Sequence, residues 1–171
     1  MLYFSEPDHA GHTFGPNNPE TKRVVEQMDS LIGVLVSKIE KTPEAKNTDL
    51  IIVSDHGMGA APDSTNIVID KYISKEWCKQ VEGHNPCYLI NPQPGYADSI
   101  ISNLRKAEHL HVWRKNEIPS YLNYGSNSRI FPVVVLADSG YSLTWSNKAR
   151  ANGGAHGYDV RNTNMHGIFY A

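Results

Sequence analysis

The order of apolar segments along the chain constrains its fold more than any other feature. Residues 2–5 and 50–53 are short apolar runs that end in polar residues, which predicts two buried strands. Between them, Asn18 is placed to cap a helix with Pro19 in its first turn. Apolar residues then recur at helical spacing and predict one continuous face of a long amphipathic helix: Val24, Val25, Met28, Leu31, Ile32, Leu35, Val36 and Ile39. Strand, helix and strand in this order predict a βαβ unit of a parallel sheet covered on both faces.

The middle of the chain is less regular. It predicts strands and one helix separated by polar turns: strands at 66–69, 87–90, 111–113 and 129–137, a helix at 96–104, and a hairpin partner for 129–137 at 141–145. A glycine-rich loop at 152–157 precedes a last strand at 168–171. We therefore expect an α/β fold with a mostly parallel sheet flanked by helices, formed by residues 1–60 and 150–171. Residues 61–149 are expected to form a smaller α+β insertion.

Both ends of the chain read as apolar strands, whereas the ends of a domain are usually polar and frayed. This pattern predicts an incomplete fragment of a larger fold. If the terminal strands lack neighbours, their unpaired edges predict self-association.

Composition excludes several classes of protein. The chain has 171 residues, about one domain, and its 16 basic and 18 acidic side chains give a net charge of −2. That balance does not favour a nucleic-acid duplex as partner. No apolar run approaches the ~18 residues of a membrane span. Two cysteines, Cys78 and Cys87, are too few for a disulfide scaffold.

Three segments gather the side chains that bind metal ions. Asp8 and His12 follow the first predicted strand, Asp55 and His56 follow the second, and His156 lies in the glycine-rich loop. Ligands of open α/β sheets bind beyond the carboxyl ends of the strands, so the first four residues are expected on one rim. Mixed carboxylate and imidazole ligands suit zinc or a similar divalent ion.

Simpler interpretations of the same residues stay open at this point. Asp8 and His12 would also serve as a turn-stabilising carboxylate with an exposed imidazole, and Asp55 as the cap of the next turn. A histidine such as His156 in a surface loop needs no functional explanation.

Three blocks of sequence resemble a known family. EPDHAGHTFGP, IIVSDHGM and GGAHGYD, in this order, resemble the zinc-ligand motifs of the nucleotide pyrophosphatase/phosphodiesterase family, in the alkaline phosphatase superfamily. CYLINPQPG, HVWRKNEIPSYLNYGSNSRI and MHGIFYA are similar to the segments between and after them. The resemblance covers nearly the whole chain. Val160 departs from the Asn that often follows GYD, and it lies outside the ligand set.

The resemblance implies two zinc ions. It assigns Asp8, His12 and His156 to one zinc, and Asp55 and His56 to the second. In the family the second zinc also binds an Asp and a Thr nucleophile, which lie upstream of the strand expected at residues 2–5. Neither Thr13 nor Thr65 matches the nucleophile motif. This chain alone is therefore expected to be inactive or nearly so.

The resemblance also implies a function. It predicts hydrolysis of phosphodiester or pyrophosphate bonds in nucleotides, outside the cytoplasm. The alternatives are a phosphodiesterase for lysophospholipid or choline-phosphate diesters, a phosphomonoesterase or phosphomutase-like enzyme, and a non-catalytic fragment that binds a metal or a partner. An extracytoplasmic location permits a disulfide between Cys78 and Cys87, and two free thiols are the equal alternative.

Overall fold

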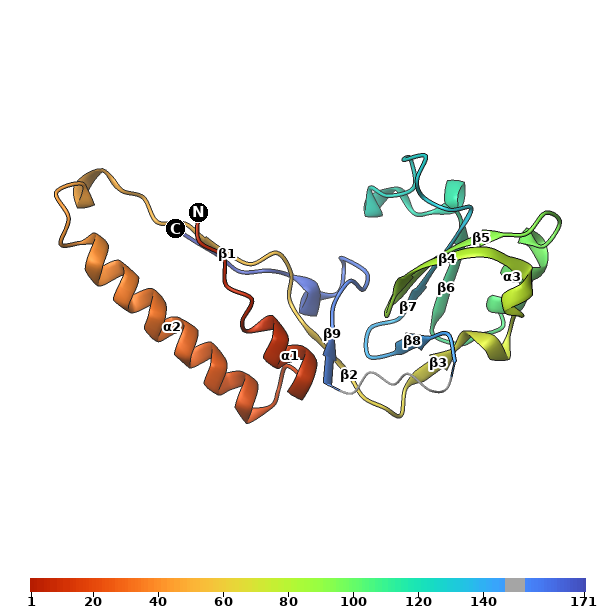
Figure 1. The fold of residues 1–171 in the computed structure, drawn as a ribbon, viewed down its shortest axis with the longest axis horizontal. Coiled ribbons are helices and arrows are strands. Elements are labelled where there is room, and N and C mark those ends of the chain that lie inside the picture. The colour runs from red at the N-terminus through yellow and green to blue at the C-terminus, as the bar shows by residue number, and fades with distance from the viewer. Residues whose placement is uncertain (147–152) are drawn as a thin grey trace.

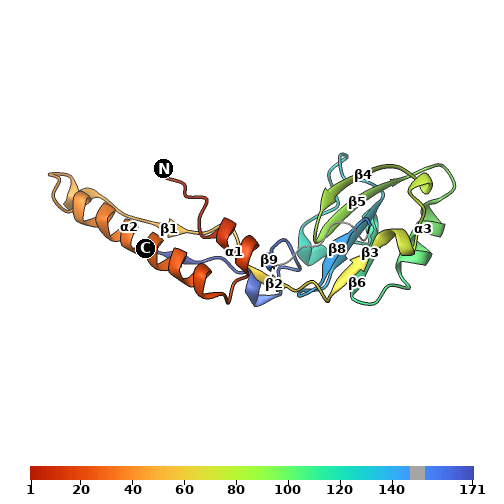
Figure 2. The same ribbon diagram turned by 60° about the horizontal axis from the view of Figure 1, so that its bottom comes forward.

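The longest helix and the largest sheet of the described residues lie at opposite ends of the molecule. The structure is a computed structural model, and it describes residues 1–146 and 153–171. Helix α2 (Pro19–Ile39) lies at one end, a four-stranded sheet lies at the other, and α1 (Asp8–Phe14) lies between them (Figure 1). Figure 2 shows the same separation from a second direction. In the described part of the chain, six 3₁₀ turns join the elements: Ala45–Asn47, Ile69–Lys71, Lys75–Trp77, Lys115–Glu117, Ser120–Leu122 and Thr163–Met165.

Two of the helices form where the sequence predicts them. Asn18 caps α2 by accepting a hydrogen bond from Glu20 N at 2.9 Å, and Pro19 occupies the first helical position. Helix α3 (Ala97–Leu104) buries Ile100, Ile101 and Leu104 on one face. Capping and periodicity are local signals, and both helices follow from them.

The strand at residues 2–5 does not form, and the expected parallel βαβ unit is therefore wrong for the described residues. Instead, β1 (Ile52–Val53) pairs antiparallel with β10 (Phe169–Tyr170). β1 is not buried as predicted, since Val53 is 63% exposed. The apolar face of α2 is half-buried at most, and Leu31 on that face is 52% exposed. An apolar run becomes a buried strand only where another layer covers it, and within residues 1–146 and 153–171 no segment buries β1 or the whole apolar face of α2.

The four-stranded sheet lies within the expected insertion. Its order is β4 (Cys78–His84), β5 (Cys87–Pro92), β7 (Val133–Ala137) and β6 (Leu110–Arg114), and every neighbouring pair is antiparallel. β7 begins four residues later than expected, and all five of its residues are buried. Side chains from this sheet, α3 and β8 form the main core, in which the largest fully buried members are Ile69, Ile90, Ile100, Leu104, Leu143, Val133 and Val135.

The segment after β7 does not form the expected hairpin with it. β8 (Ser142–Thr144) instead pairs in parallel with β3 (Asn66–Val68). Ser142 N donates to the carbonyl of Thr65 at 2.8 Å, and Thr144 Oγ1 donates to Asn66 Oδ1 at 3.1 Å. These long-range hydrogen bonds pair β8 with β3. They could not be inferred from the turn residues between β7 and β8.

The expected loop at 152–157 contains a strand. β9 (Gly153–Ala155) pairs antiparallel with β2 (Gly59–Ala61), between α1 and the insertion (Figure 1). The first residue of the expected loop, Asn152, lies outside the described residues, as do 147–151 at the junction of the two expected regions.

The two cysteines are free thiols. Cys78 lies opposite Pro92 at one end of the β4–β5 hairpin, and Cys87 lies opposite His84 at the other end. A disulfide needs Cα atoms within about 7 Å, so the length of the hairpin excludes this pairing. No helix among the described residues has the length and apolar character needed to cross a bilayer.

Candidate metal centre

Helix α1 presents Asp8 and His12 on one face. The sequence predicted no helix here, but the spacing of four residues is the spacing of neighbours on a helix surface. Asp8 stands in the first turn, where a carboxylate interacts favourably with the positive end of the helix dipole. The Glu6 carboxylate accepts a hydrogen bond from Ala10 N at 3.1 Å and holds the start of the helix. The helical spacing in α1 therefore brings Asp8 and His12 together as a pair of candidate ligands.

Two glycines bring β9 directly against α1. A Cβ atom on Gly154 would lie 2.5 Å from the carbonyl oxygen of Gly11, and one on Gly153 would lie 2.1 Å from that of His12. Gly153 also has a φ of 125°, a conformation that favours glycine. The close approach carries His156, the residue after β9, to the ligand face of α1.

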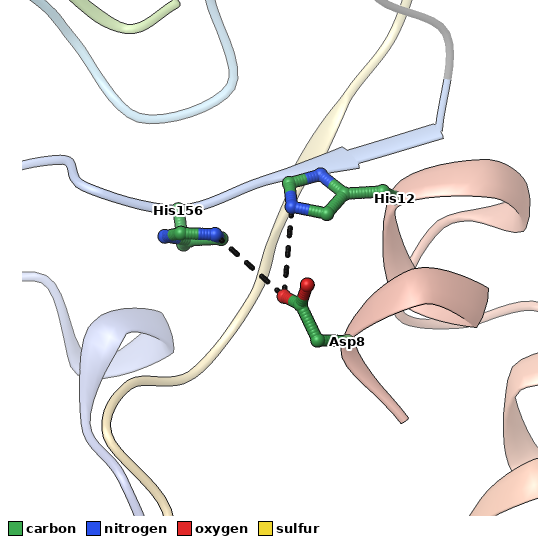
Figure 3. A group of neighbouring side chains, drawn as sticks. All are labelled: Asp8, His12 and His156. Atoms are coloured by element: carbon green, nitrogen blue, oxygen red, sulfur yellow. Dashed lines mark ion pairs between the residues drawn. The ribbon is translucent and has the colours of Figure 1, made fainter. Parts of the chain in front are cut away.

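Asp8, His12 and His156 converge on one point (Figure 3). Asp8 Oδ1 lies 3.5 Å from His12 Nε2 and 3.6 Å from His156 Nε2. Atoms bound to one tetrahedral zinc ion at about 2.0–2.2 Å lie about 3.3–3.6 Å from one another. Three potential ligand atoms, one from each residue, all lie within 4.8 Å of one another. The distances therefore fit a shared cation.

The hydrogen bonds of His12 leave its inner nitrogen free for a cation. His12 Nδ1 lies 2.9 Å from the carbonyl oxygen of Gly154, which can only accept, so Nδ1 carries the proton. In the neutral ring, Nε2 then presents a lone pair to Asp8 Oδ1. This oxygen is buried and has no hydrogen-bond partner among the described residues. Two facing acceptors repel each other, and a cation between them would satisfy both.

The second pair of predicted ligands lies next to this group without joining it. The His56 ring stacks on the His156 ring with centroids 3.5 Å apart and planes 15° apart. His56 Nδ1 lies 2.8 Å from the carbonyl oxygen of Gly57, so the backbone fixes its tautomer as it fixes that of His12. Asp55 is directed toward its neighbour, since Oδ1 accepts a hydrogen bond from His56 N at 3.1 Å.

Burial favours the neutral form of His156, which is the form that binds a metal ion. Burial lowers the pKa of His156 below its ordinary value, and His56 lowers it further, while Asp8 acts in the opposite direction. A neutral imidazole offers a lone pair at neutral pH, whereas an imidazolium does not.

The sequence did not indicate the carbonyl groups that orient two of the candidate ligand histidines. Gly154 orients His12, and Gly57 orients His56. The available signal was the glycine near each ligand histidine, which allows the backbone to approach closely.

Comparisons with known proteins identify the family. A family model described as type I phosphodiesterase / nucleotide pyrophosphatase matches residues 1–159. The chain belongs to this family. It is 33% identical over its whole length to human ectonucleotide pyrophosphatase/phosphodiesterase family member 5, and it covers 36% of that protein. It is 32% identical to human bis(5'-adenosyl)-triphosphatase ENPP4 over 96% of the chain and 36% of that protein.

Solved structures of family members confirm the α/β fold class. Murine ectonucleotide pyrophosphatase/phosphodiesterase 5 superimposes with a TM-score of 0.94 at 34% identity, over 98% of this chain and 45% of that one. The human protein of the same name gives a TM-score of 0.91 at 32% identity. The chain thus spans less than half the length of these relatives.

Proposed function

We propose that Asp8, His12 and His156 bind one zinc ion and that Asp55 and His56 contribute to a second, adjacent zinc site. The convergence of three potential ligand atoms on the unpaired Asp8 oxygen carries the first assignment. The stacking of His56 on His156 supports the second, because it brings the two sites together. Neighbouring metal sites are the arrangement that clamps both the attacking and the leaving oxygen in phosphoryl displacement.

We further propose that the protein hydrolyses phosphodiester or pyrophosphate bonds in nucleotides. The names of the matched relatives support this substrate class, including bis(5'-adenosyl)-triphosphatase ENPP4, and one solved structure of the murine relative holds AMP. The Thr nucleophile and a further Asp ligand would come from residues outside positions 1–171. The "ecto-" prefix in the relatives' names supports a location outside the cytoplasm.

Each part of this chain has a definite task in the proposed reaction. When bound, zinc supplies a Lewis acid that makes water reactive near neutral pH. Asp8 offers the charge that holds the cation, and His12 and His156 complete a three-residue ligand set of the kind seen in catalytic sites with an open position. The carbonyls of Gly154 and Gly57 hold the imidazoles in the tautomer that binds metal.

Metal analysis of variants tests this proposal. The purified chain is expected to retain about one zinc ion after dialysis, as one complete three-residue ligand set predicts. Asp8→Ala and His156→Ala are expected to lose it, because each removes a ligand atom. His84→Ala is the matched control, since His84 is exposed at the end of β4. An unmodified chain without zinc, or equal zinc in all four proteins, would contradict the proposal.

Activity measurements test the second part. The 171-residue chain alone is expected to release no nitrophenol from the nitrophenyl ester of thymidine monophosphate, because the nucleophile is not in it. A longer protein that includes the family's Thr and Asp motifs should release nitrophenol and lose that activity in the Asp8→Ala variant. Zinc-dependent release by the short chain would overturn the assignment of the nucleophile.

A further inference from the structure

The segment that follows His156 is fastened to the insertion by side-chain hydrogen bonds. Tyr158 is 4% exposed, and its hydroxyl donates to the carbonyl oxygen of Tyr141 at 2.9 Å. Asn162 Nδ2 donates to Ser139 Oγ. These contacts join the segment that follows a proposed metal ligand to a part of the chain that contributes no ligand.

One further contact of this segment involves a charged residue. The Tyr121 hydroxyl, from the 3₁₀ turn Ser120–Leu122, donates to Asp159 Oδ2. Asp159 Oδ1 accepts from Arg161 N at 2.8 Å, and the Arg161 guanidinium lies 3.5 Å from the centre of the Tyr121 ring. Hydrogen bonds to an ionised carboxylate are stronger than neutral ones, and a cation over an aromatic ring adds attraction.

The electrostatics agree with an ionised Asp159 and a neutral Tyr121. The hydrogen bond to Asp159 raises the pKa of Tyr121 above its ordinary value. Burial alone would raise the pKa of Asp159, but the bonds from Tyr121 and Arg161 N, together with the Arg161 charge, outweigh it and leave that pKa lowered. The pair therefore keeps its donor and acceptor roles at neutral pH.

The hydrogen bond between Tyr121 and Asp159 lies close enough in sequence to His156 to affect the candidate metal centre. Asp159 lies three residues after His156, and the residue next to His156 is Gly157, with a φ of 90°. A glycine in this conformation leaves the backbone freer than any other residue would. The hydrogen bonds of Tyr158, Asp159 and Asn162 all lie beyond Gly157, and loss of the charged one would remove part of the restraint on the His156 ring.

We propose that Tyr121 is a positioning residue for the metal site: through Asp159 it holds the segment that keeps His156 Nε2 3.6 Å from Asp8 Oδ1. This inference rests on the proposed function. It gives the insertion a role in the metal centre although it supplies no ligand. The contact spans 38 residues of sequence, so the motif around His156 does not reveal it.

The test compares two tyrosine-to-phenylalanine variants in the same segment. Tyr121→Phe removes the hydroxyl and keeps the ring beneath Arg161. Tyr124→Phe is the matched control, because Tyr124 is 46% exposed and makes no hydrogen bond to residues 156–162 in the described part of the chain. Co²⁺ replaces zinc as a probe, since its visible absorption reports ligand geometry.

Tyr121→Phe is expected to weaken Co²⁺ binding about threefold to tenfold, less than the 10–100-fold loss typical of direct partners of a ligand, and to change the visible spectrum. Tyr124→Phe should match the unmodified chain. Asp159→Asn should weaken binding similarly, and the double variant should be no weaker than the worse single variant, because both changes break one contact. Unchanged affinity and spectrum in Tyr121→Phe would overturn the inference.

The imidazole resonances of His156 in the metal-free chain give a second measurement. Tyr121→Phe should shift or broaden them and Tyr124→Phe should not, a difference that a loss of overall stability alone would not produce. Equal spectra in both variants would also overturn the positioning role. If the unmodified chain binds no Co²⁺ and Tyr121→Phe still changes the His156 resonances, the zinc proposal fails. The role of Tyr121 in positioning His156 then stands.

Discussion

Replacing Gly154 by alanine is expected to separate β9 from α1 and damage the metal centre without changing any of the proposed ligand side chains. The new Cβ would lie 2.5 Å from the carbonyl oxygen of Gly11 and 2.8 Å from Met58 Cγ, whereas ordinary contact begins at 3.4 Å. The carbonyl of Gly11 belongs to a helix and cannot turn aside, so the strand must move by about 0.9 Å, the difference between 2.5 and 3.4 Å.

This displacement has two measurable costs. Overpacking of this kind costs about 1–3 kcal/mol of unfolding free energy, offset by roughly 0.5–1 kcal/mol from the smaller entropy of the unfolded alanine chain. The bond between His12 Nδ1 and the Gly154 carbonyl, now 2.9 Å, would exceed normal hydrogen-bond length. Loss of a bond that orients a ligand typically lowers metal affinity by about 10–100-fold.

Gly33→Ala supplies the matched control for Gly154→Ala. Gly33 lies on the exposed side of α2, and a Cβ there meets nothing within 4 Å. Because alanine is the better helix former, Gly33→Ala should stabilise the chain by about 0.5–1 kcal/mol and leave zinc affinity unchanged. Urea unfolding followed by circular dichroism and calorimetric zinc titration measure both quantities. If Gly154→Ala matched the parent chain in both while Gly33→Ala behaved as expected, the packing argument for β9 would be refuted.

Three further predictions concern other parts of the molecule. Burial and His56 hold the pKa of His156 below its ordinary value, so the unfolded chain takes up a proton at this residue at a higher pH than the folded chain does. The unfolding free energy should therefore decline as pH falls below about 6.5, and it should become constant below the pKa of His156 in the folded chain. Urea titrations at a series of pH values should show a smaller decline in His156→Asn, and an equal decline would count against the pKa shift. The edges of β1 and β10 should cause self-association, because Val53, Phe169 and Tyr170 are all more than 60% exposed. Sedimentation should show Phe169→Lys shifted toward monomer, and a strictly monomeric parent chain at high concentration would contradict this. Alkylation without reductant should modify both thiols, with Cys87 slower because burial raises its pKa to about 11. A disulfide-linked peptide found by mass spectrometry would contradict the hairpin geometry.

The sequence predicted the elements whose signals are local. The Asn18 cap and the periodicity of residues 24–39 located α2, and continuous apolar residues located β5 and β7. Pairing between distant segments was not predictable in this way. The partner of β8 depends on contacts with β3, and the exposure of β1 depends on whether another layer covers it. A single sequence contains the apolar pattern but not the identity of the covering layer.

In the candidate site, too, local signals were predictable from the sequence and long-range contacts were not. Residue types and motif order identified Asp8, His12 and His156, which the structure brings together. The assignment of Asp55 and His56 to a second ion stays a prediction. The sequence did not predict helix α1, although the spacing of four between Asp8 and His12 was its local signal. It also did not indicate Tyr121, because a hydrogen bond between remote loops leaves no periodic pattern.

The position of the candidate metal centre depends on the contacts that hold α1 in place. These contacts do not involve the partly exposed apolar face of α2. Buried Thr21, near the start of α2, donates through Oγ1 to the carbonyl of Gly15 at 2.7 Å and also contacts that of Ala10 at 3.3 Å. On its other side, α1 contacts β9 through glycines 142 residues away in sequence. The ligand face is therefore fixed by the first turn of α2 and by β9, not by the apolar face further along α2. Substitutions at exposed Leu31 should then alter association or stability without altering the separations among Asp8, His12 and His156.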